Sequence, residues 1–184
     1  FILDDSGSMT GDPWNELNNA YTTFVNKRKV ATGTNNERIS ICMFGADCKI
    51  IEPKIIPWSN APALNFRRSP GTDFFSALQG ALTCLNADTK NTYTPVIVFM
   101  TDGGNGGQDP IPIVKQIETK YKDKGLMSKY VSFGPNANTA SLNAMANECT
   151  SDKARRATVS HANIGELTQI FMEIENSCVI AEYN

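Results

Sequence analysis

Hydrophobic residues follow two alternating spacings along the chain, one typical of buried strands and the other of amphipathic helices. Short apolar runs, which indicate strands, occupy residues 1–3, 38–44, 49–51, 96–100, 129–133 and 157–159. Between these runs, apolar residues recur every three or four positions, which predicts helices with one buried face. The apolar positions of the five helices are Trp14, Leu17, Tyr21 and Phe24; Phe74, Leu78, Ala81, Leu82 and Leu85; Ile113, Val114, Ile117 and Tyr121; Leu142, Met145 and Cys149; and Leu167, Ile170, Phe171 and Ile174.

The residues at the predicted helix boundaries are of the types that usually form them. Asp12-Pro13 and Asp109-Pro110 each place an acidic cap before a proline, which is favoured in the first helical turn. Gly125 is placed to end the third helix in a left-handed conformation. Thr139 is expected to cap the fourth helix.

Strands and helices that alternate through the whole chain predict a mostly parallel sheet with helices on both faces. The unbroken apolar run at 96–100 is typical of a strand in the middle of such a sheet. The run at 49–51 closely follows its neighbour and is expected to be an antiparallel edge strand, and residues 53–71 form a proline-containing loop. The predicted fold class is therefore α/β, with a Rossmann-like, doubly wound, mostly parallel central sheet and one short antiparallel edge strand.

Length and composition are those of one globular domain. Of the 184 residues, 41% are hydrophobic and 20% charged, and no repeat or low-complexity tract divides them. We expect a single domain over residues 1–184, excised from a larger protein because a strand begins at once with Phe1. No apolar run approaches the roughly 20 residues of a membrane span. The net charge of −2 gives no general attraction to nucleic acid, so neither membrane insertion nor nucleic-acid binding is expected.

The chain has five cysteines, at positions 42, 48, 84, 149 and 178. None belongs to a C-x-x-C pair, which argues against a zinc site. Four of them, all except Cys48, stand among apolar residues, so free buried thiols are expected, with one or more disulfides as the alternative. There is no N-x-S/T glycosylation sequon. Together these features favour an intracellular, reducing compartment but leave the localisation open.

Side chains that carry oxygen follow the predicted strands at the sheet edge where open α/β folds bind their ligands. Asp4-Asp5-Ser6-Gly7-Ser8 follows the first strand, Thr101-Asp102-Gly103 follows the central strand, and Gly71-Thr72-Asp73 precedes the second helix. Their donors are carboxylates and hydroxyls, with no histidine or cysteine. Such an all-oxygen set suits a hard cation such as Mg²⁺.

These three segments, in this order and spacing, resemble the motifs of the von Willebrand factor type A domain family over essentially the whole chain. Residues 1–9 are similar to the first strand of the family and its D-x-S-x-S motif. Residues 71–73 and 101–103 are similar to its threonine and aspartate loops. The resemblance implies a complete metal-ion-dependent adhesion site, and the residues that it assigns to the metal are Asp4, Ser6, Ser8, Thr72 and Asp102.

The resemblance also implies a role for each of these residues. Ser6 and Ser8 would coordinate Mg²⁺ directly, with Mn²⁺ or Ca²⁺ as substitutes, whereas Asp4 and Asp102 would act mostly through water or as hydrogen-bond anchors. Thr72 would bind the ion directly once a ligand is engaged. Because neutral hydroxyl ligands leave the cation electron-poor, an Asp or Glu of a protein partner can complete its coordination. The expected function is therefore Mg²⁺-dependent protein binding, as in adhesion, without enzyme activity.

Two other functions stay open on the sequence. The domain could be a structural scaffold, or a regulatory part of a larger assembly or enzyme, in which the metal site is not used for ligand capture. It could also transfer phosphoryl groups, as haloacid-dehalogenase-like phosphatases do. Those enzymes use a D-x-D motif, whereas this chain has Ser6 at the second position. The identity of the partner, the oligomeric state and any movement of the last helix are left open.

Several other conspicuous residues are given structural roles. Asp5 is expected to face the solvent, and Asp73 to favour the start of the second helix through the helix dipole. His161, the one histidine of the chain, is expected at the surface of a polar loop. Trp14 lies on an apolar helix face and is expected in the core, whereas Trp58 is as consistent with a partner contact as with the core.

Overall fold

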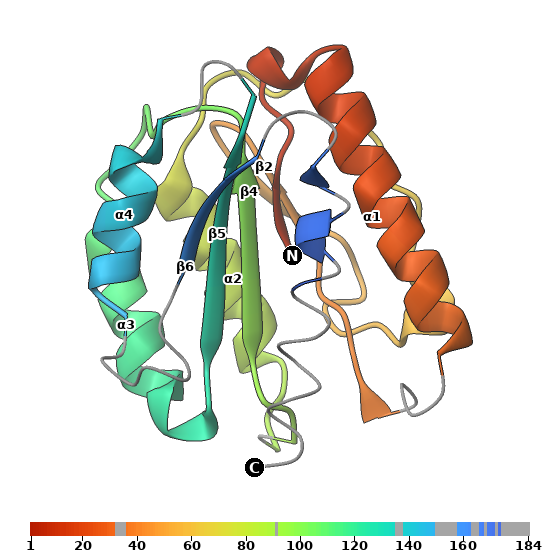
Figure 1. Ribbon diagram of the computed structural model, residues 1–184. Coiled ribbons are helices and arrows are strands. Elements are labelled where there is room, and N and C mark those ends of the chain that lie inside the picture. Colours follow the sequence, from red (N-terminus) through yellow and green to blue (C-terminus); the bar gives the residue numbers. More distant parts are fainter. Residues whose placement is uncertain are drawn as a thin grey trace.

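The computed structural model describes residues 1–31, 36–90, 92–134, 138–149, 158–162, 166–167, 169–171 and 173. Its centre is a six-stranded sheet with the strand order β3-β2-β1-β4-β5-β6 (Figure 1). The strands are β1 (Ile2–Asp4), β2 (Cys42–Phe44), β3 (Cys48–Ile50), β4 (Val96–Thr101), β5 (Met127–Phe133) and β6 (Thr158–Ala162).

Neighbouring strands run parallel except for β2 and β3, which pair antiparallel at one edge of the sheet. β1 has β2 on one side and β4 on the other, so the chain winds outward from β1 in both directions. This reversal is the switch point at which open α/β sheets bind their ligands. The predicted fold class is confirmed, and so is the antiparallel edge strand, one residue earlier than predicted.

Helices cover both faces of the sheet (Figure 1). α1 (Asp12–Val30) lies on one face, and α2 (Phe74–Asn86), α3 (Ile111–Tyr121) and α4 (Thr139–Asn147) lie on the other. Residues 167, 169–171 and 173 are also helical, and their apolar side chains join the core on the side of α1. Of the apolar positions predicted for the last helix, Ile174 lies outside the described residues.

The predicted apolar helix faces are buried in two cores, one on each side of the sheet. Trp14, Leu17, Tyr21 and Phe24 of α1 are all at most 9% exposed, which confirms the prediction for Trp14. Trp58 is also buried and meets Phe24 edge to face, with ring centroids 5.7 Å apart. Trp58 is therefore a core residue of the domain.

The strand predicted at residues 38–44 forms only over its last three residues. Ile39 instead pairs with Ile56 in an isolated antiparallel bridge, through two backbone hydrogen bonds of 2.8 and 2.9 Å. Apolar residues indicate a buried extended segment, but they do not specify which segment it pairs with. Ile39 is therefore tied to the loop at 53–71, whereas Ser40 accepts a hydrogen bond from the amino group of Phe1 at 2.7 Å and Ile41 accepts one from Ile51 N at 2.9 Å.

Two predicted helix starts are wrong by one residue. Gly11, and not Asp12, is the cap of α1, and its φ of 88° is a left-handed value that glycine adopts at no steric cost. Asn138, and not Thr139, caps α4, because its side-chain oxygen accepts a hydrogen bond from the backbone N–H of Ala140 at 2.9 Å. In both cases the cap lies immediately before the residue that the pattern indicated.

The third helix begins and ends close to the predicted residues. The side chain of Asp109 accepts a hydrogen bond from the backbone N–H of Ile111 at 3.1 Å, which satisfies one free donor of the first turn. Gly125, with φ of 79°, ends the short 3₁₀ turn that follows α3. The left-handed conformation expected for this glycine is confirmed.

The last strand corrects the prediction for His161. This residue lies within β6, where its backbone is aligned with Ser132 of β5, and not in a polar loop. β6 begins at Thr158, and Ala157, the first residue of the predicted strand, lies outside the described residues. None of the helices in the described ranges is long and apolar enough to cross a bilayer.

The four cysteines in the described part of the chain are free thiols, as predicted; Cys178 lies outside it. The sulfur atoms of Cys42 and Cys84 are 3.7 Å apart between β2 and α2, a contact and not a bond. A hydrogen bond with Cys48 and burial raise the pKa of Cys42 to about 12. This thiol therefore stays protonated and behaves as a small hydrophobic group.

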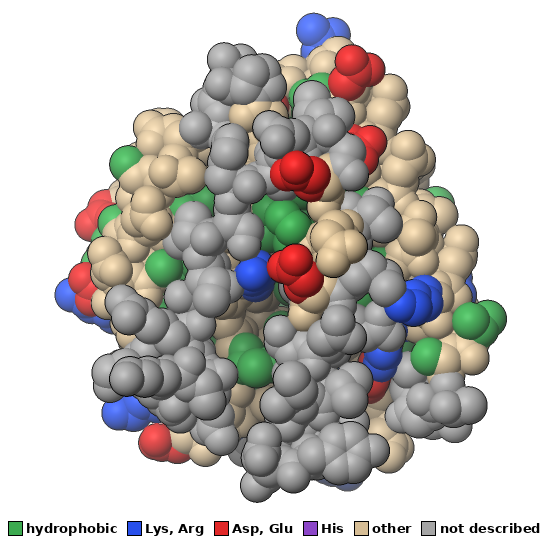
Figure 2. All heavy atoms as spheres, viewed as in Figure 1, with side chains coloured by type: hydrophobic (Ala, Val, Ile, Leu, Met, Phe, Trp, Pro, Cys, Tyr) green, Lys and Arg blue, Asp and Glu red, His purple; other side chains and the backbone are tan. Residues whose placement is uncertain are grey.

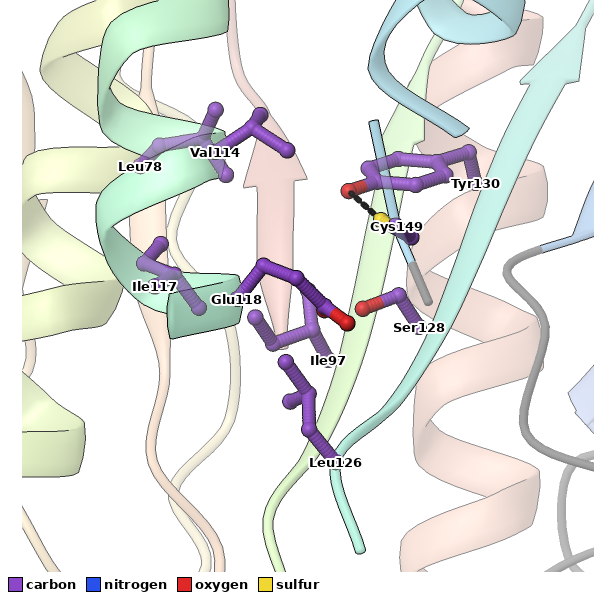
Figure 3. Close-up of a pocket in the computed structure, with 9 residues that line it drawn as sticks. All are labelled: Leu78, Ile97, Val114, Ile117, Glu118, Leu126, Ser128, Tyr130 and Cys149. Carbon is purple, nitrogen blue, oxygen red and sulfur yellow. Dashed lines mark hydrogen bonds between the residues drawn. The ribbon is translucent and has the colours of Figure 1, made fainter. Parts of the chain in front are cut away.

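A small cavity lies under α3, between that helix and strands β4 and β5 (Figure 3). Its volume is about 10 Å³, and its wall includes Glu118, Ser128, Tyr130 and Cys149. The hydroxyl of Tyr130 lies 3.7 Å from the sulfur of Cys149, and burial raises the pKa of Tyr130. A space of this size holds at most a single water molecule, so it is no small-molecule site.

Candidate metal centre

The oxygen-bearing segments predicted to form a site come together at the carboxyl edge of the sheet, near the top of Figure 1. β1 ends at Asp4 and β4 ends at Thr101, and these two strands are paired neighbours. The residues that follow them therefore emerge side by side at the switch point of the sheet.

Asp4 is fully buried and accepts a hydrogen bond on each carboxylate oxygen. Oδ1 accepts from the backbone N–H of Ser6 at 2.8 Å, and Oδ2 accepts from the hydroxyl of Thr101 at 2.6 Å. Burial raises the pKa of Asp4 to about 6, although the hydrogen bonds from Ser6 and Thr101 oppose the shift. The negative charge of Asp102 raises this pKa further. The ionised carboxylate is therefore held at a cost that a nearby cation would remove.

The hydroxyls of Ser6 and Ser8 and the carboxylate of Asp102 form a continuous chain of contacts. The two serine Oγ atoms are 3.0 Å apart, and the hydroxyl of Ser8 donates to Asp102 Oδ1 at 2.8 Å. Ser6 and Asp102 are buried whereas Ser8, the middle member of this chain, is exposed, so these side chains meet where the interior reaches the surface. Burial also raises the pKa of Asp102. Four of the five predicted ligands thus lie together.

Thr72, the fifth predicted ligand, is half-buried on a loop that backbone hydrogen bonds fix beside the other four. Ser69 pairs with Ser6 in a parallel bridge, and its N–H donates to Asp5 O at 2.8 Å. The N–H of Gly106 donates to Thr72 O at 2.8 Å, which joins the threonine loop to the aspartate loop. Within the described ranges, no hydrogen bond links the Thr72 side chain to the other four residues. Its role as a ligand stays a prediction.

Asp5 is buried, which corrects the prediction that it faces the solvent. It forms a two-pronged ion pair with Arg67, whose Nε and Nη2 donate to the two carboxylate oxygens at 2.5 and 2.9 Å. Arg67 also donates to Met43 O at 3.0 Å and to Asp47 at 3.2 Å. Arg67 was missed because it lies 62 residues from Asp5, in a loop where no local spacing indicates the pairing.

Gly45 lets the loop that carries Thr72 approach β2 closely. A Cβ atom added at this glycine would lie 2.4 Å from the Cβ of Ser69, well inside van der Waals contact. Two short backbone hydrogen bonds close the contact, from Ala46 N to Pro70 O at 2.6 Å and from Asp73 N to Gly45 O at 2.7 Å. The position of the threonine loop thus depends on a glycine that the predicted motif does not include.

Two further residues, Asp73 and Asn105, fix the start of α2 beside the site. Asp73 caps the helix, because its side chain accepts hydrogen bonds from the backbone N–H of Phe75 at 3.0 Å and from the hydroxyl of Ser76 at 2.7 Å. The predicted role of Asp73 at the helix start is confirmed. Asn105, which the sequence analysis missed, accepts from the backbone N–H of Phe74 at 3.0 Å and so ties the aspartate loop to α2.

The donors of this site fit a hard divalent cation. The predicted ligands offer only carboxylate and hydroxyl oxygen, and burial raises the pKa of both carboxyl groups. Among the described residues, no three His, Cys, Asp or Glu side chains gather in one place. That result agrees with a centre that has only two carboxylates, Asp4 and Asp102, and otherwise uses hydroxyls.

Comparison with known families identifies the class of protein that this fold and site define. The chain belongs to the von Willebrand factor type A domain family, whose model matches residues 1–173. Among curated proteins, no individual sequence matches.

Several solved structures share the fold. A von Willebrand factor type A protein from Catenulispora acidiphila has a TM-score of 0.76 and 14% identity, over 94% of this chain and 40% of that one. Proximal thread matrix protein 1 from the mussel byssus, with a zinc-occupied MIDAS motif, has a TM-score of 0.66 and 14% identity, over 96% and 46%. The SpRpn10 VWA domain has a TM-score of 0.64 and 11% identity, over 91% and 89%. The chain spans less than half the length of the first two, and these identities show the fold alone.

Replacing Asp4 by Asn is expected to stabilise the metal-free domain. The folded-state pKa of about 6 lies above the ordinary value of 3.8, so above pH 6 ionisation of Asp4 costs the folded state up to about 3 kcal/mol. Asn avoids this cost, and its advantage should shrink as the pH falls from 7 towards 3, because the carboxyl is protonated below about pH 6 in the folded state and below about pH 3.8 in the unfolded state. Urea unfolding in EDTA across this pH range measures the difference; a variant less stable than the wild type at pH 7 would contradict the assignment.

Replacing Arg67 by Met is expected to destabilise the domain by about 3 kcal/mol, because it leaves the buried Asp5 carboxylate without its partner. The double variant Asp5→Asn, Arg67→Met removes both charges and should recover most of the loss. Chemical unfolding of the two single variants and the double variant gives the coupling energy. Additive effects would show that the ion pair does not hold these loops together.

Proposed function

We propose that this domain is a Mg²⁺-dependent protein-binding module that captures an Asp or Glu side chain of a partner, and that it is not an enzyme. The observation that carries the proposal is the convergence of the oxygen donors of Asp4, Ser6, Ser8 and Asp102 at the carboxyl edge of the sheet, where Ser8 is exposed. Membership of the von Willebrand factor type A family supports it, because this is a general family of protein-interaction modules.

The residues of the site prepare it for a cation in distinct ways. Because the hydroxyl proton of Ser8 is donated to Asp102, Ser6 is the donor in the 3.0 Å contact between the two serines, and one lone pair of the Ser8 oxygen is left to face an ion. Asp4 holds the backbone of Ser6 from below and fixes where that side chain begins. A bound Mg²⁺ would supply the positive charge that attracts a carboxylate of the partner.

A structural neighbour supports the choice of a divalent metal. In proximal thread matrix protein 1 the MIDAS motif is occupied by zinc. This chain shares the fold of that protein, and we infer by analogy that its oxygen-bearing loops also hold a divalent ion. Oxygen-only donors favour Mg²⁺ here, with Mn²⁺ or Ca²⁺ as substitutes, because zinc sites generally include nitrogen or sulfur ligands.

The chemistry of the three loops favours binding over catalysis. They contain Ser6, Ser8 and Thr72, but no histidine or lysine that could act as a general base for these hydroxyls. Ser6 also stands where a phosphatase D-x-D motif would have its second carboxylate. The group beside Ser8 is the carboxylate of Asp102, which suits an ion anchor.

The distribution of charge favours a protein partner over nucleic acid. Acidic and basic side chains are interspersed on the described part of the face in Figure 2, without a broad basic patch. The whole chain has a net charge of −2. Attraction to a partner carboxylate would therefore come from the local field of the site and not from the domain as a whole.

Addition of Mg²⁺ is expected to raise the melting temperature of the wild-type domain, and Ser8→Ala and Asp102→Ala should abolish this rise while the domain still folds. A ligand at about 100 times its dissociation constant stabilises by about 2.7 kcal/mol, which corresponds to about 5–10 °C for a chain of this length. Ser59→Ala and Asp123→Ala change exposed residues away from the site and should keep the wild-type response. If both site variants still gain the full shift, the site is wrongly assigned.

Recovery of the partner from an extract is expected to depend on the metal. The immobilised wild-type domain should retain a protein in Mg²⁺ and lose it in EDTA, and Asp102→Ala should retain none in either buffer. Recovery that is equal in Mg²⁺ and EDTA would favour the alternative function, a scaffold or regulatory domain whose metal site does not capture ligands.

A further inference from the structure

One arginine at the carboxyl edge of the sheet makes no side-chain hydrogen bond or ion pair with the described part of the chain. This arginine, Arg68, is exposed. We propose that Arg68 binds a second carboxylate of the acidic partner, so that the surface recognises a segment with two acidic residues. This inference rests on the function proposed above.

The neighbours of Arg68 place it beside the metal centre. Arg67 is held by the buried Asp5, and Ser69 is buried and forms a bridge with Ser6. Consecutive Cα atoms are about 3.8 Å apart and bridged strands about 4.8 Å apart, so the Cα atoms of Arg68 and Ser6 lie within about 9 Å. An extended arginine side chain can cover most of that distance.

The backbone of Arg68 adopts an unfavourable conformation. Its φ of 54° is in the left-handed region, and Arg68 is the one non-glycine residue with a positive φ among the described residues. Asparagine and glycine tolerate this region better than arginine, so local conformational preference does not explain an arginine here. Strained residues of this kind are concentrated at binding and catalytic sites, where function maintains them.

The charges around Arg68 leave its guanidinium available to a ligand. Arg67 and Arg68 are the basic residues of the loops at 5–11, 45–47, 67–73 and 102–110, which form this edge. The charge of Arg67 is paired with Asp5 and Asp47. Arg68 has no such acidic partner in the described residues, and guanidinium groups bind carboxylates through two parallel hydrogen bonds.

The short distance between Arg68 and the metal centre limits the spacing of the two acidic groups. In an extended peptide, residues i and i+2 point to the same side and lie about 7 Å apart. The Cα atoms of Arg68 and Ser6 lie within about 9 Å of each other, so two acidic residues at this spacing can face the metal centre and Arg68 at the same time. The preferred partner is therefore an extended segment with two acidic residues separated by one other residue.

The test uses two blocked pentapeptides, acetyl-Gly-Glu-Gly-Glu-Gly-amide and acetyl-Gly-Glu-Gly-Gln-Gly-amide, titrated into the domain in Mg²⁺ and followed by NMR. The wild type is expected to bind the peptide with two acidic residues about threefold more tightly, the range of an exposed charge pair. Arg68→Asn should bind the two peptides equally. Lys122→Asn, which makes the same charge change at an exposed residue after α3, should keep the preference.

A second readout separates recognition from folding. Arg68→Asn is expected to melt at the same temperature as the wild type or higher, because asparagine fits the left-handed backbone better. Its Mg²⁺-induced thermal shift should also be unchanged. A loss of peptide preference would then reflect the missing guanidinium alone.

The outcomes distinguish this inference from the proposed function. If the wild type binds both peptides equally and in a Mg²⁺-dependent manner, the role of Arg68 is refuted and the proposed function stands. If neither peptide binds in a Mg²⁺-dependent manner, the proposed function fails and the inference fails with it. If Arg68→Asn loses its Mg²⁺-induced thermal shift, Arg68 supports the metal centre and does not read a second carboxylate.

Discussion

The hydrogen bond from the hydroxyl of Thr101 to Asp4 Oδ2, at 2.6 Å, joins the ends of the two central strands, and the candidate site is built outward from it. It is fully buried, and an unpaired carboxylate at this place would be costly. The other oxygen of Asp4 holds the backbone of Ser6, which sets the direction of the loop that leads to Ser8. A buried acid at the end of β1 thus orders both strands and the loop above them.

The fold could be predicted because its main signals are local. The apolar faces of α1, α2 and α3 are set by residues three or four apart, and the continuous apolar run of β4 marks the centre of the sheet. What the pattern could not decide was pairing: Ile39 joins Ile56 and not β1. Trp58 likewise stands in a long proline-containing loop, and only its tertiary contacts with the aromatic residues of the core show that it is buried.

For the candidate site, too, the sequence predicts the residues that follow the strands but not the contacts between distant segments. Asp4, Ser6, Ser8 and Asp102 could be predicted to meet, because they follow strands that turn out to be neighbours at the switch point. The contacts that hold these four residues in place could not be predicted. Gly45 and Asn105 each act on a residue of another loop, and no spacing within either loop indicates that contact. The ion pair between Asp5 and Arg67 could not be predicted either, because nothing in the sequence distinguishes Asp5 from an exposed acidic residue of a loop.

The link between the threonine and aspartate loops has a consequence for how this surface can evolve. It runs from Gly106 N to Thr72 O, so both of its atoms belong to the main chain. Neither of its two atoms belongs to a side chain, so most side-chain substitutions leave its donor and acceptor in place. Exposed residues of the two loops can accumulate substitutions that alter which proteins are bound, while the frame that carries the oxygen donors keeps its shape. Binding preference can therefore diverge between related domains without loss of the fold.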